Sequence, residues 1–217
     1  MDHAERSGDR VSDTSTGAVG GRHSSASNEH YTPLLIVEAA RLTLSAIDLD
    51  PASCEAANRV VKAARIFTKD DNGLVQPWHG RVFNNPPGGL IRGVGSSQKT
   101  WWFKLAAEWR SGRVSAAIFV CFSVELFQVA QVDTPAGLPT PLDLPFCVPA
   151  SRVAYLTPSD QFGLFTGEPE LREGASPPHS SAVVFFPPRV ETAEAIERFR
   201  AAFGPIGKVV IPSGGAA

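Results

Sequence analysis

The sequence predicts an α/β protein built as one domain, and three observations lead to this fold class. Short apolar runs alternate with helical patterns from residue 33 onward, as in folds with a central, largely parallel sheet. The run from Val114 to Cys121 is continuously apolar, which is typical of a central strand covered on both faces. With 217 residues the chain can bury one substantial core, and two full domains are not expected.

Each predicted element has a local reason in the sequence. Thr32 is suited to cap, and Pro33 to open, the first helix. Two prolines, Pro86 and Pro87, end a strand because they cannot donate to a ladder of hydrogen bonds. The expected helices cover residues 33–45, 54–64, 98–111, 123–131 and 192–203, the expected strands cover 47–50, 81–84, 114–121, 152–156, 182–186 and 206–211, a turn is expected at 70–73, and irregular loops are expected at 88–97 and 134–149.

The N-terminal segment and the cysteine pattern narrow the class of protein. Residues 1–28 are rich in Ser, Gly, Asp and Arg and are predicted to form a disordered polar tail, with the folded domain at 29–213. The three cysteines form neither a close pair nor a Cys-x-x-Cys motif, which argues against a disulfide scaffold or a zinc ribbon. We expect a cytoplasmic protein, since no segment has the pattern of a membrane span or a secretory signal.

The charge is unevenly distributed along the chain. Between Arg59 and Arg113 ten basic and three acidic residues give +7, so the rest of the chain carries −9 of the total of −2. A basic middle segment is what a polyanion-binding surface requires. Solvated helix faces account for the same pattern, and charge by itself favours that reading.

The tripeptide Asn85-Pro86-Pro87 directly follows a predicted strand, where ligands bind in open α/β sheets. The prolines stiffen the backbone and direct the Asn85 side-chain oxygen and the Pro86 carbonyl outward. Two such acceptors can hold both hydrogens of an exocyclic amine while its nitrogen attacks a methyl sulfonium, without a strong base. In isolation, the tripeptide is more often a rigid turn with an exposed asparagine.

Its surroundings extend this pattern across residues 28–87. They comprise Glu29-His30-Tyr31-Thr32-Pro33, Asp48-Leu49-Asp50-Pro51-Ala52-Ser53, Asn58, Phe67-Thr68-Lys69-Asp70-Asp71-Asn72-Gly73-Leu74, Trp78 and Val82-Phe83-Asn84-Asn85-Pro86-Pro87. In order and spacing this set resembles the phage-type DNA N6-adenine methyltransferases, and a weaker similarity continues through residues 102–105 and the later strands. The resemblance implies a single-domain Rossmann-like methyltransferase fold with a mostly parallel central sheet flanked by helices.

The resemblance also implies roles for particular residues. Asn85, Pro86 and Pro87 would be catalytic and would hold the target amine. Asp50 resembles the acidic residue of the S-adenosylmethionine site, although an acid at that position also suits a helix cap. Tyr31-Thr32-Pro33 resembles the segment that closes over the methionine end of that cofactor, a role compatible with a helix N-cap. The implied cofactor-binding residues are Tyr31, Thr32, Pro33, Asp48, Asp50, Pro51, Ala52 and Ser53.

The chain departs from the family at Gly88, where the usual pattern has an aromatic residue that stacks on a flipped-out base. Either another aromatic side chain supplies this platform, or the activity is altered or lost. The candidates are Phe83, Trp101, Trp102 and Phe122.

The segment from Gly93 to Thr100 approaches a phosphate-binding P-loop, but Gln98 precedes the lysine where the motif requires glycine. We therefore expect it to be a loop whose Arg92 and Lys99, with Lys104 in the following helix, contact DNA phosphates; a plain surface loop is the alternative. The histidines show no metal-ligand spacing, so no metal site is predicted.

Together these readings predict methyl transfer from S-adenosylmethionine to the N6 amine of adenine in double-stranded DNA, with the base flipped out of the duplex. The first alternative is a non-catalytic protein that keeps the fold and binds DNA or a partner, which Gly88 favours. The second is methylation of another planar amine, in an RNA base or a protein glutamine.

Overall fold

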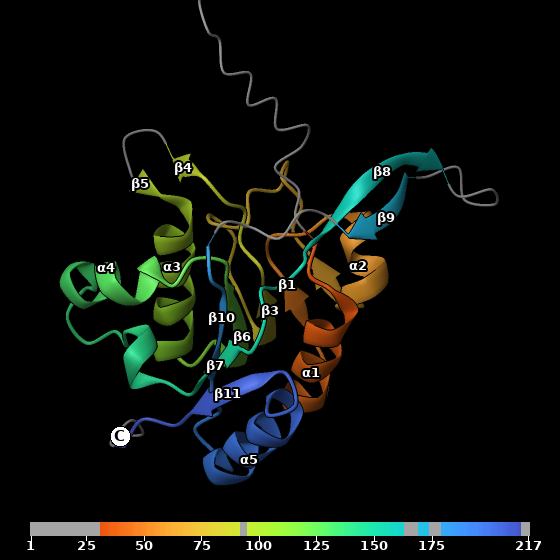
Figure 1. The fold of residues 1–217 in the computed structure, drawn as a ribbon. Helices are drawn as coiled ribbons and strands as arrows, with labels where there is room; N and C mark the ends of the chain where they lie inside the picture. Colours follow the sequence, from red (N-terminus) through yellow and green to blue (C-terminus); the bar gives the residue numbers. More distant parts are fainter. Residues whose placement is uncertain (1–30, 92–94, 163–168, 174–178, 214–217) are drawn as a thin grey trace, which may run out of the picture.

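The computed structural model describes residues 31–91, 95–162, 169–173 and 179–213. A seven-stranded sheet forms the middle of three layers, with helices packed on both faces (Figure 1). The helices are α1 (Leu34–Leu44), α2 (Glu55–Val61), α3 (Ser97–Arg110), α4 (Glu125–Asp133) and α5 (Thr192–Phe203), with a 3-10 turn η1 at Pro141–Asp143. The sheet strands are β1 (Leu49–Asp50), β2 (Arg65–Ile66), β3 (Gly80–Asn84), β6 (Val114–Cys121), β7 (Phe146–Pro149), β10 (Ala182–Phe186) and β11 (Gly207–Val210).

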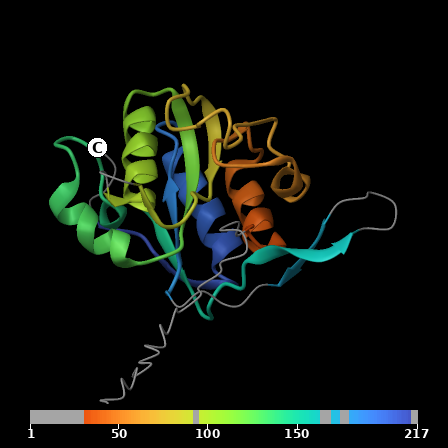
Figure 2. The ribbon, with the colours of Figure 1, turned by 90° about the horizontal axis from the view of Figure 1, so that it is seen from above.

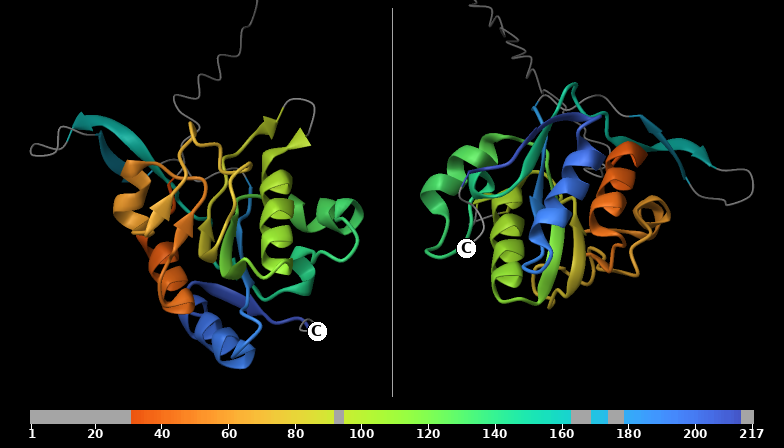
Figure 3. Two further views of the ribbon diagram at one scale, coloured as in Figure 1. Left: turned by 180° about the vertical axis from the view of Figure 1, so that it is seen from behind. Right: turned by 90° about the horizontal axis from the view of Figure 1, so that it is seen from below.

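Two hairpins lie outside this sheet. One is β4 (Leu90–Ile91) with β5 (Gly95–Ser96), and the other is β8 (Leu156–Phe162) with β9 (Pro169–Glu173). Figure 1 shows both hairpins at the same end of the molecule, one on each side of it, and the view from behind in Figure 3 agrees. That end is the one toward which the chain runs out of β3, because β4 follows β3 directly.

The strand order is β11-β7-β10-β6-β3-β1-β2. The four strands β6, β3, β1 and β2 pair in parallel, whereas the pairings β6–β10, β10–β7 and β7–β11 are antiparallel. The α/β class is confirmed, but the expectation of a mostly parallel sheet is wrong, since half of the described pairings are antiparallel. The physical reason lies in β7, because the expected irregular loop at 134–149 ends in an apolar strand that pairs on both sides.

Each face of the sheet buries its own core. On one face the apolar stripes of α1 and α5 cover Phe83 and Phe185, with Phe199 stacked on Phe185 at 5.1 Å between ring centres. On the other face Trp101 and Trp102 of α3 cover β3 and β6, and α4 packs beside α3. Figures 2 and 3 show α3 and α4 on one side of the sheet and α1, α2 and α5 on the other. The alternation of side chains along β3 divides its residues between these two cores.

Most predicted elements are present, with differences at their ends. The first helix begins at Leu34 with Pro33 at the N-cap position, so the expectation that Thr32 caps it is wrong. The expected strand at 152–156 is wrong as well, because regular pairing starts only at Leu156 and belongs to the β8–β9 hairpin. The strand β2 and the hairpin β4–β5 were not predicted, since two-residue strands leave no periodic pattern to detect. The hairpin of the longer strands β8 and β9 was not predicted either.

The order of the parallel strands reverses between β1 and β3. From β1 the chain passes through α2 to β2 on one side, and β3 then pairs on the other side of β1. Of the flanking helices, α2 contributes Val61 to the core under α1, whereas α3 lies on the opposite face. Such a reversal opens a crevice at the carboxyl ends of the two strands, and this crevice is where open α/β sheets bind ligands.

The turn at residues 70–73 packs against the loop that follows β1. A Cβ atom added to Gly73 would lie 2.0 Å from the carbonyl oxygen of Pro51, so only glycine permits this approach. The Gly73 carbonyl also accepts a hydrogen bond of 2.7 Å from the buried indole of Trp78. The turn sequence therefore shapes the loop at the carboxyl end of β1.

We expect Gly73→Ala to lower the free energy of unfolding by about 1–3 kcal/mol, because the new methyl group forces the Pro51 backbone to move. Gly137→Ala is the control: its Cβ meets open space, so it reports only the cost of an alanine at φ +83°. Urea unfolding of both variants measures the comparison. A loss at Gly73 no larger than that at Gly137 would show that the loop yields without cost.

Candidate functional site

Three chain segments meet at the carboxyl edge of neighbouring strands. Leu49 of β1 pairs with Val82 of β3, and Asn84 of β3 pairs with Phe119 of β6. Asp50 therefore ends β1 next to the end of β3, which continues into Asn85-Pro86-Pro87, and β6 runs on to Phe122. Neighbouring strands lie about 4.8 Å apart, so the three segments lie side by side along one edge.

Asp50 is a buried acid, with 3% of its surface exposed. The Ala52 N–H donates a hydrogen bond of 3.2 Å to its Oδ1 atom. Burial raises the pKa of the Asp50 carboxyl to about 7, while the Ala52 amide and the nearby Ser53 hydroxyl oppose the shift. The Ser53 hydroxyl is itself buried without a partner at hydrogen-bond geometry. A titratable group poised near neutral pH at a ligand-binding edge is typical of a functional site.

The loop after Asp50 is held by its neighbours on two sides. The Phe67 N–H donates to the Asp50 carbonyl, and the Ser53 N–H donates to the Phe67 carbonyl, both at 3.0 Å. On the other side the Cys54 thiol donates to the Tyr31 hydroxyl at 3.5 Å. Tyr31 is tied in turn to Leu156 at the base of the β8–β9 hairpin by two backbone hydrogen bonds of 2.8 Å.

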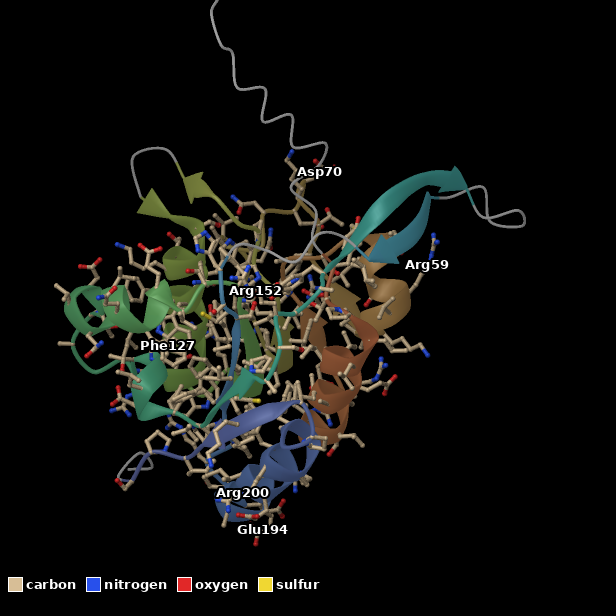
Figure 4. The ribbon with its side chains drawn as sticks, viewed as in Figure 1. Arg59, Asp70, Phe127, Arg152, Glu194 and Arg200 are labelled. Carbon is tan, nitrogen blue, oxygen red and sulfur yellow. The ribbon has the colours of Figure 1, made fainter. Side chains whose placement is uncertain are left out.

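These contacts bring most of the predicted cofactor residues together. Tyr31, next to buried Thr32 and to Pro33 at the start of α1, reaches the loop Pro51-Ala52-Ser53 through Cys54. Sequence proximity does not predict this contact, because residues 31 and 54 are joined only through the fold. The turn at 70–73 borders the same loop, and Figure 4 shows Asp70 at the end of the molecule opposite to Glu194 and Arg200 of α5.

Asp48 is placed differently from the other predicted cofactor residues. Both of its carboxylate oxygens accept hydrogen bonds of 2.8 Å from the Arg81 guanidinium, and the Arg81 backbone N–H donates to Oδ2 as well. The Arg81 hydrogen bonds hold the pKa of Asp48 below its ordinary value. This bidentate pair ties the chain before β1 to the start of β3, and Asp48 is not brought to the carboxyl edge with Asp50.

The tripeptide Asn85-Pro86-Pro87, which the sequence predicts to be catalytic, lies between the Asp50 loop and β6. Pro86 is buried, Asn85 is half-buried and Pro87 is exposed. The preceding residue, Asn84, was not among the predicted site residues. It is completely buried, and neither its amide nitrogen nor its carbonyl oxygen has a hydrogen-bond partner in the part of the chain that the structure describes. Its position as the last residue of a buried strand was the signal that could have identified it, because a polar side chain there requires a reason.

A cavity of about 290 Å³ opens beside the end of β6. This volume is at the lower end of the range for small-molecule sites, roughly 300–1,000 Å³. Its lining combines apolar groups with polar groups from α3, α4 and the segment before β10; the residues include Gln98, Phe122, Ser123, Leu126, Val129 and His179. The sequence analysis assigned neither Gln98 nor His179 to a cavity, because their place there depends on the packing of distant elements.

The predicted phosphate contacts have partners within the chain. Lys99 forms an ion pair of 2.7 Å with Asp133, and Lys104 forms one of 2.6 Å with the buried Glu108, which also binds Arg113. Arg92 lies outside the described residues. With Arg81 bound to Asp48, four of the ten basic residues in the segment 59–113 form ion pairs among the described residues. Glu108 is already counted in the +7 of the segment, so only Asp48 and Asp133, which lie outside it, offset part of that charge.

Two further observations concern the described part of the chain. No group of three or more His, Cys, Asp or Glu side chains within it is placed to hold a metal ion. None of its helices has both the length and the apolar character needed to cross a membrane.

Comparison with known proteins adds no identification. No protein-family model matches the chain, and no curated protein or solved structure shows significant similarity to it.

The buried Asp50 generates a pH dependence of stability. Its folded pKa of about 7 lies above the unfolded value of 3.8, so the folded state retains a proton that the unfolded state releases. Stability from this group is therefore greatest below pH 4 and falls by about 4 kcal/mol as the pH rises to 7. Asp50→Asn removes this fall. Urea unfolding should therefore show that the free energy of unfolding of the variant rises relative to that of the unliganded wild type between pH 4 and pH 8.

Asp48→Asn provides the control for this measurement. The pKa of Asp48 is lowered by Arg81, so the wild type exceeds this variant at neutral pH and the difference shrinks as the pH falls below 4. If Asp50→Asn and the wild type kept a constant difference across the range, Asp50 would not be the titrating group.

The partnerless Asn84 amide generates a second prediction. We expect Asn84→Leu to raise the free energy of unfolding of the unliganded protein by about 1–3 kcal/mol, since it removes two buried polar atoms without partners. The matched control is Asn58→Leu, because the Asn58 side chain bonds both the N–H and the carbonyl of Ala63, at 2.8 and 3.2 Å. That variant should lose stability. Equal losses in both would show that the Asn84 amide is satisfied in solution.

Proposed function

We propose that this protein transfers a methyl group from S-adenosylmethionine to the N6 amine of adenine in DNA. One observation carries the proposal: the buried acid Asp50 and the tripeptide Asn85-Pro86-Pro87 end adjacent parallel strands, at the point where the strand order reverses. A cofactor and an acceptor group held on these two segments would lie next to each other. The methyltransferase role itself rests on the sequence resemblance described above, with which this arrangement agrees.

The residues around Asp50 suit a ligand with several polar groups. The carboxylate accepts hydrogen bonds from hydroxyl or ammonium groups, and the buried Asn84 amide has no partner among the described residues, while the buried Ser53 hydroxyl lies near Asp50 without a bond of good geometry. S-adenosylmethionine offers ribose hydroxyls, an ammonium group and a carboxylate, and when bound it supplies an electrophilic methyl sulfonium. Asp50, Ser53 and the loop between them would hold it, with Tyr31 reaching the same loop.

Asn85 and Pro86 would act on the acceptor amine. A side-chain oxygen and a backbone carbonyl oxygen accept both amine hydrogens, which draws the nitrogen lone pair out of conjugation with the ring. The two prolines keep these acceptors fixed, so little reorganisation is needed when the amine attacks. As the nitrogen forms its bond to the methyl carbon, the carbon–sulfur bond would break and a neutral thioether would leave, and the methylated amine would then lose one of its hydrogens as a proton to water. This mechanism depends on position and hydrogen bonding, and no residue has to remove a proton before the attack.

DNA is the acceptor proposed because of the resemblance, and the shape of the site edge is compatible with it. The hairpins β4–β5 and β8–β9 flank the carboxyl edge on opposite sides, as Figure 1 shows. Arg152, which Figure 4 labels near the middle of the molecule, is exposed and has no ion-pair partner among the described residues. We include Arg152 with Arg92, Lys99 and Lys104 among the residues that would contact phosphate.

The alternative is a protein that keeps this fold and binds DNA or a partner without methyl transfer. Gly88 favours it, because the chain lacks the aromatic side chain that the family pattern has after Pro87. Methylation of an RNA base or a protein glutamine uses the same amine chemistry and is a further outcome of the assay below.

The proposal predicts label transfer from S-adenosylmethionine to unmethylated duplex DNA, recovered as N6-methyladenine after nucleoside digestion and chromatography. Asn85→Ala should lower the rate at least about 100-fold, since it removes an acceptor from the reacting amine. Gln131→Ala, an exposed amide on α4 away from this edge, is the matched control and should retain the wild-type rate.

The negative outcomes separate the alternatives. Cofactor binding by calorimetry without label in DNA, RNA or protein would support the non-catalytic alternative. Absence of both binding and label would remove the assignment of Asp50 to the cofactor. Full activity in Asn85→Ala would show that another group holds the amine.

A further inference from the structure

We propose that Phe122 is the stacking platform for an unpaired adenine base, and that this platform replaces the aromatic side chain absent at position 88. The inference rests on the proposed function, because it identifies the acceptor pocket of the same site. It concerns a residue on a different strand from the catalytic tripeptide.

The inference rests on how close the Phe122 ring lies to the Cβ position of Gly88. A Cβ atom added to Gly88 would lie 3.7 Å from Cζ and 3.9 Å from Cε2 of the Phe122 ring, which is ordinary van der Waals contact. Gly88 also has a backbone conformation that L-residues adopt, so the geometry itself would admit a side chain there. The ring of Phe122 therefore lies against the position from which a side chain at residue 88 would extend.

The other aromatic candidates are committed to the cores. Phe83 and Trp102 have no exposed surface, and Trp101 has 6%. Trp102 makes an edge contact with Phe119, and Trp101 stacks on Trp78. Phe122 alone among the four is only partly buried, and it lines the cavity beside β6. An aromatic face with an open side is what base stacking requires.

Gln98 fixes the backbone that carries this ring. Its Oε1 atom accepts hydrogen bonds from the N–H groups of Phe122 and Ser123, at 2.8 and 3.3 Å, and its Nε2 atom donates to the Ser123 carbonyl at 2.9 Å. Gln98 is 3% exposed, so this clamp is shielded from water. Gln98 is thus a positioning residue, and its polar atoms are occupied by the chain rather than offered to a ligand.

The rest of the cavity has a mixed lining. Leu126 and Val129 supply apolar walls and Gly89 adds no side chain over the ring, while Ser123, Glu125 and His179 supply polar groups. Asn85 and Pro86, the proposed acceptors for the amine, precede Gly88 in the same loop. A base stacked on Phe122 would present its exocyclic amine near the loop that also borders the Asp50 segment. The amine would then face a cofactor bound at that segment, as methyl transfer between the two ligands requires.

The test measures binding of fluorescein-labelled single-stranded oligo(dA) by anisotropy, without cofactor or turnover. Phe122→Ala should weaken binding roughly 5- to 150-fold, the range for loss of one stacked base, and Phe122→Tyr should bind as the wild type does. Phe127→Ala is the matched control: Phe127 is half-buried, packs on Phe146 at 5.0 Å between ring centres and does not line the cavity.

A double variant makes the test independent of folding defects in Phe122→Ala. Gly88→Tyr combined with Phe122→Ala should recover most of the lost affinity, because the new ring can occupy the space that the old one leaves. Gly88→Tyr alone should bind more weakly than the wild type, since two rings then compete for one space. Wild-type affinity in Phe122→Ala, equal losses in Phe127→Ala, or no recovery in the double variant would each overturn the inference.

The outcome is distinguishable from that of the proposed function. Phe122-dependent binding of oligo(dA) by a protein that transfers no methyl group would support the platform and contradict the enzyme. Methyl transfer to DNA with the same KM and rate in Phe122→Ala would support the enzyme and contradict the platform.

Discussion

The reversal of strand order between β1 and β3 is the constraint on which the candidate site depends. Because β2 and β3 pair on opposite sides of β1, the helices α2 and α3 that follow β1 and β3 lie on opposite faces of the sheet. No helix then covers the carboxyl ends between these two strands, and the loops that leave them diverge. The short β1 places Asp50 at this edge, and β3 places the tripeptide beside it. The strand order thus places Asp50 and the tripeptide at one edge, and the other contacts of the site adjust the loops around them.

Most of the buried side-chain polar atoms that lack a partner among the described residues lie at this edge. Asp50 is buried with a pKa near neutral, and the Ser53 hydroxyl and both polar atoms of the Asn84 amide lack partners there; the hydroxyl of Thr134, at the end of α4, is the fourth such group. Other buried polar groups are bonded, as when Gln98 binds the Phe122 backbone or Glu108 binds Lys104 and Arg113. Each unpartnered buried group costs stability, so a ligand that satisfies several of them would gain affinity and stabilise the fold at once.

The sequence predicted the parts of this structure that carry strong local patterns. The helices over 34–44, 97–110 and 192–203 and the strand 114–121 follow directly from apolar periodicity and from a continuous apolar run. It did not predict β7, whose pairing with both β10 and β11 overrides its proline-rich context. Within the site, Asp50 and Asn85 follow from their place after strands. Asn84 and Gln98 do not, because burial and long-range hydrogen bonds decide their roles.

Gly88 and Phe122 show that a residue missing from a sequence motif can have a counterpart elsewhere in the chain that lies at the same place in the fold. In sequence, glycine after Pro87 removes an aromatic group from the pattern and argues for lost activity. In the fold, a ring from the end of the neighbouring strand lies against that glycine, and a larger residue at 88 would have to share its space. Under the proposed function, the absence of the motif aromatic and the presence of Phe122 would be one packing solution, in which the ring comes from the residue after β6 and the loop after β3 supplies the acceptors for the amine. Gln98 holds the backbone of Phe122, and the N–H of the preceding Ser97 donates to the Gly89 carbonyl at 3.0 Å, so the start of α3 fixes both the segment that carries the ring and the loop that carries Gly88.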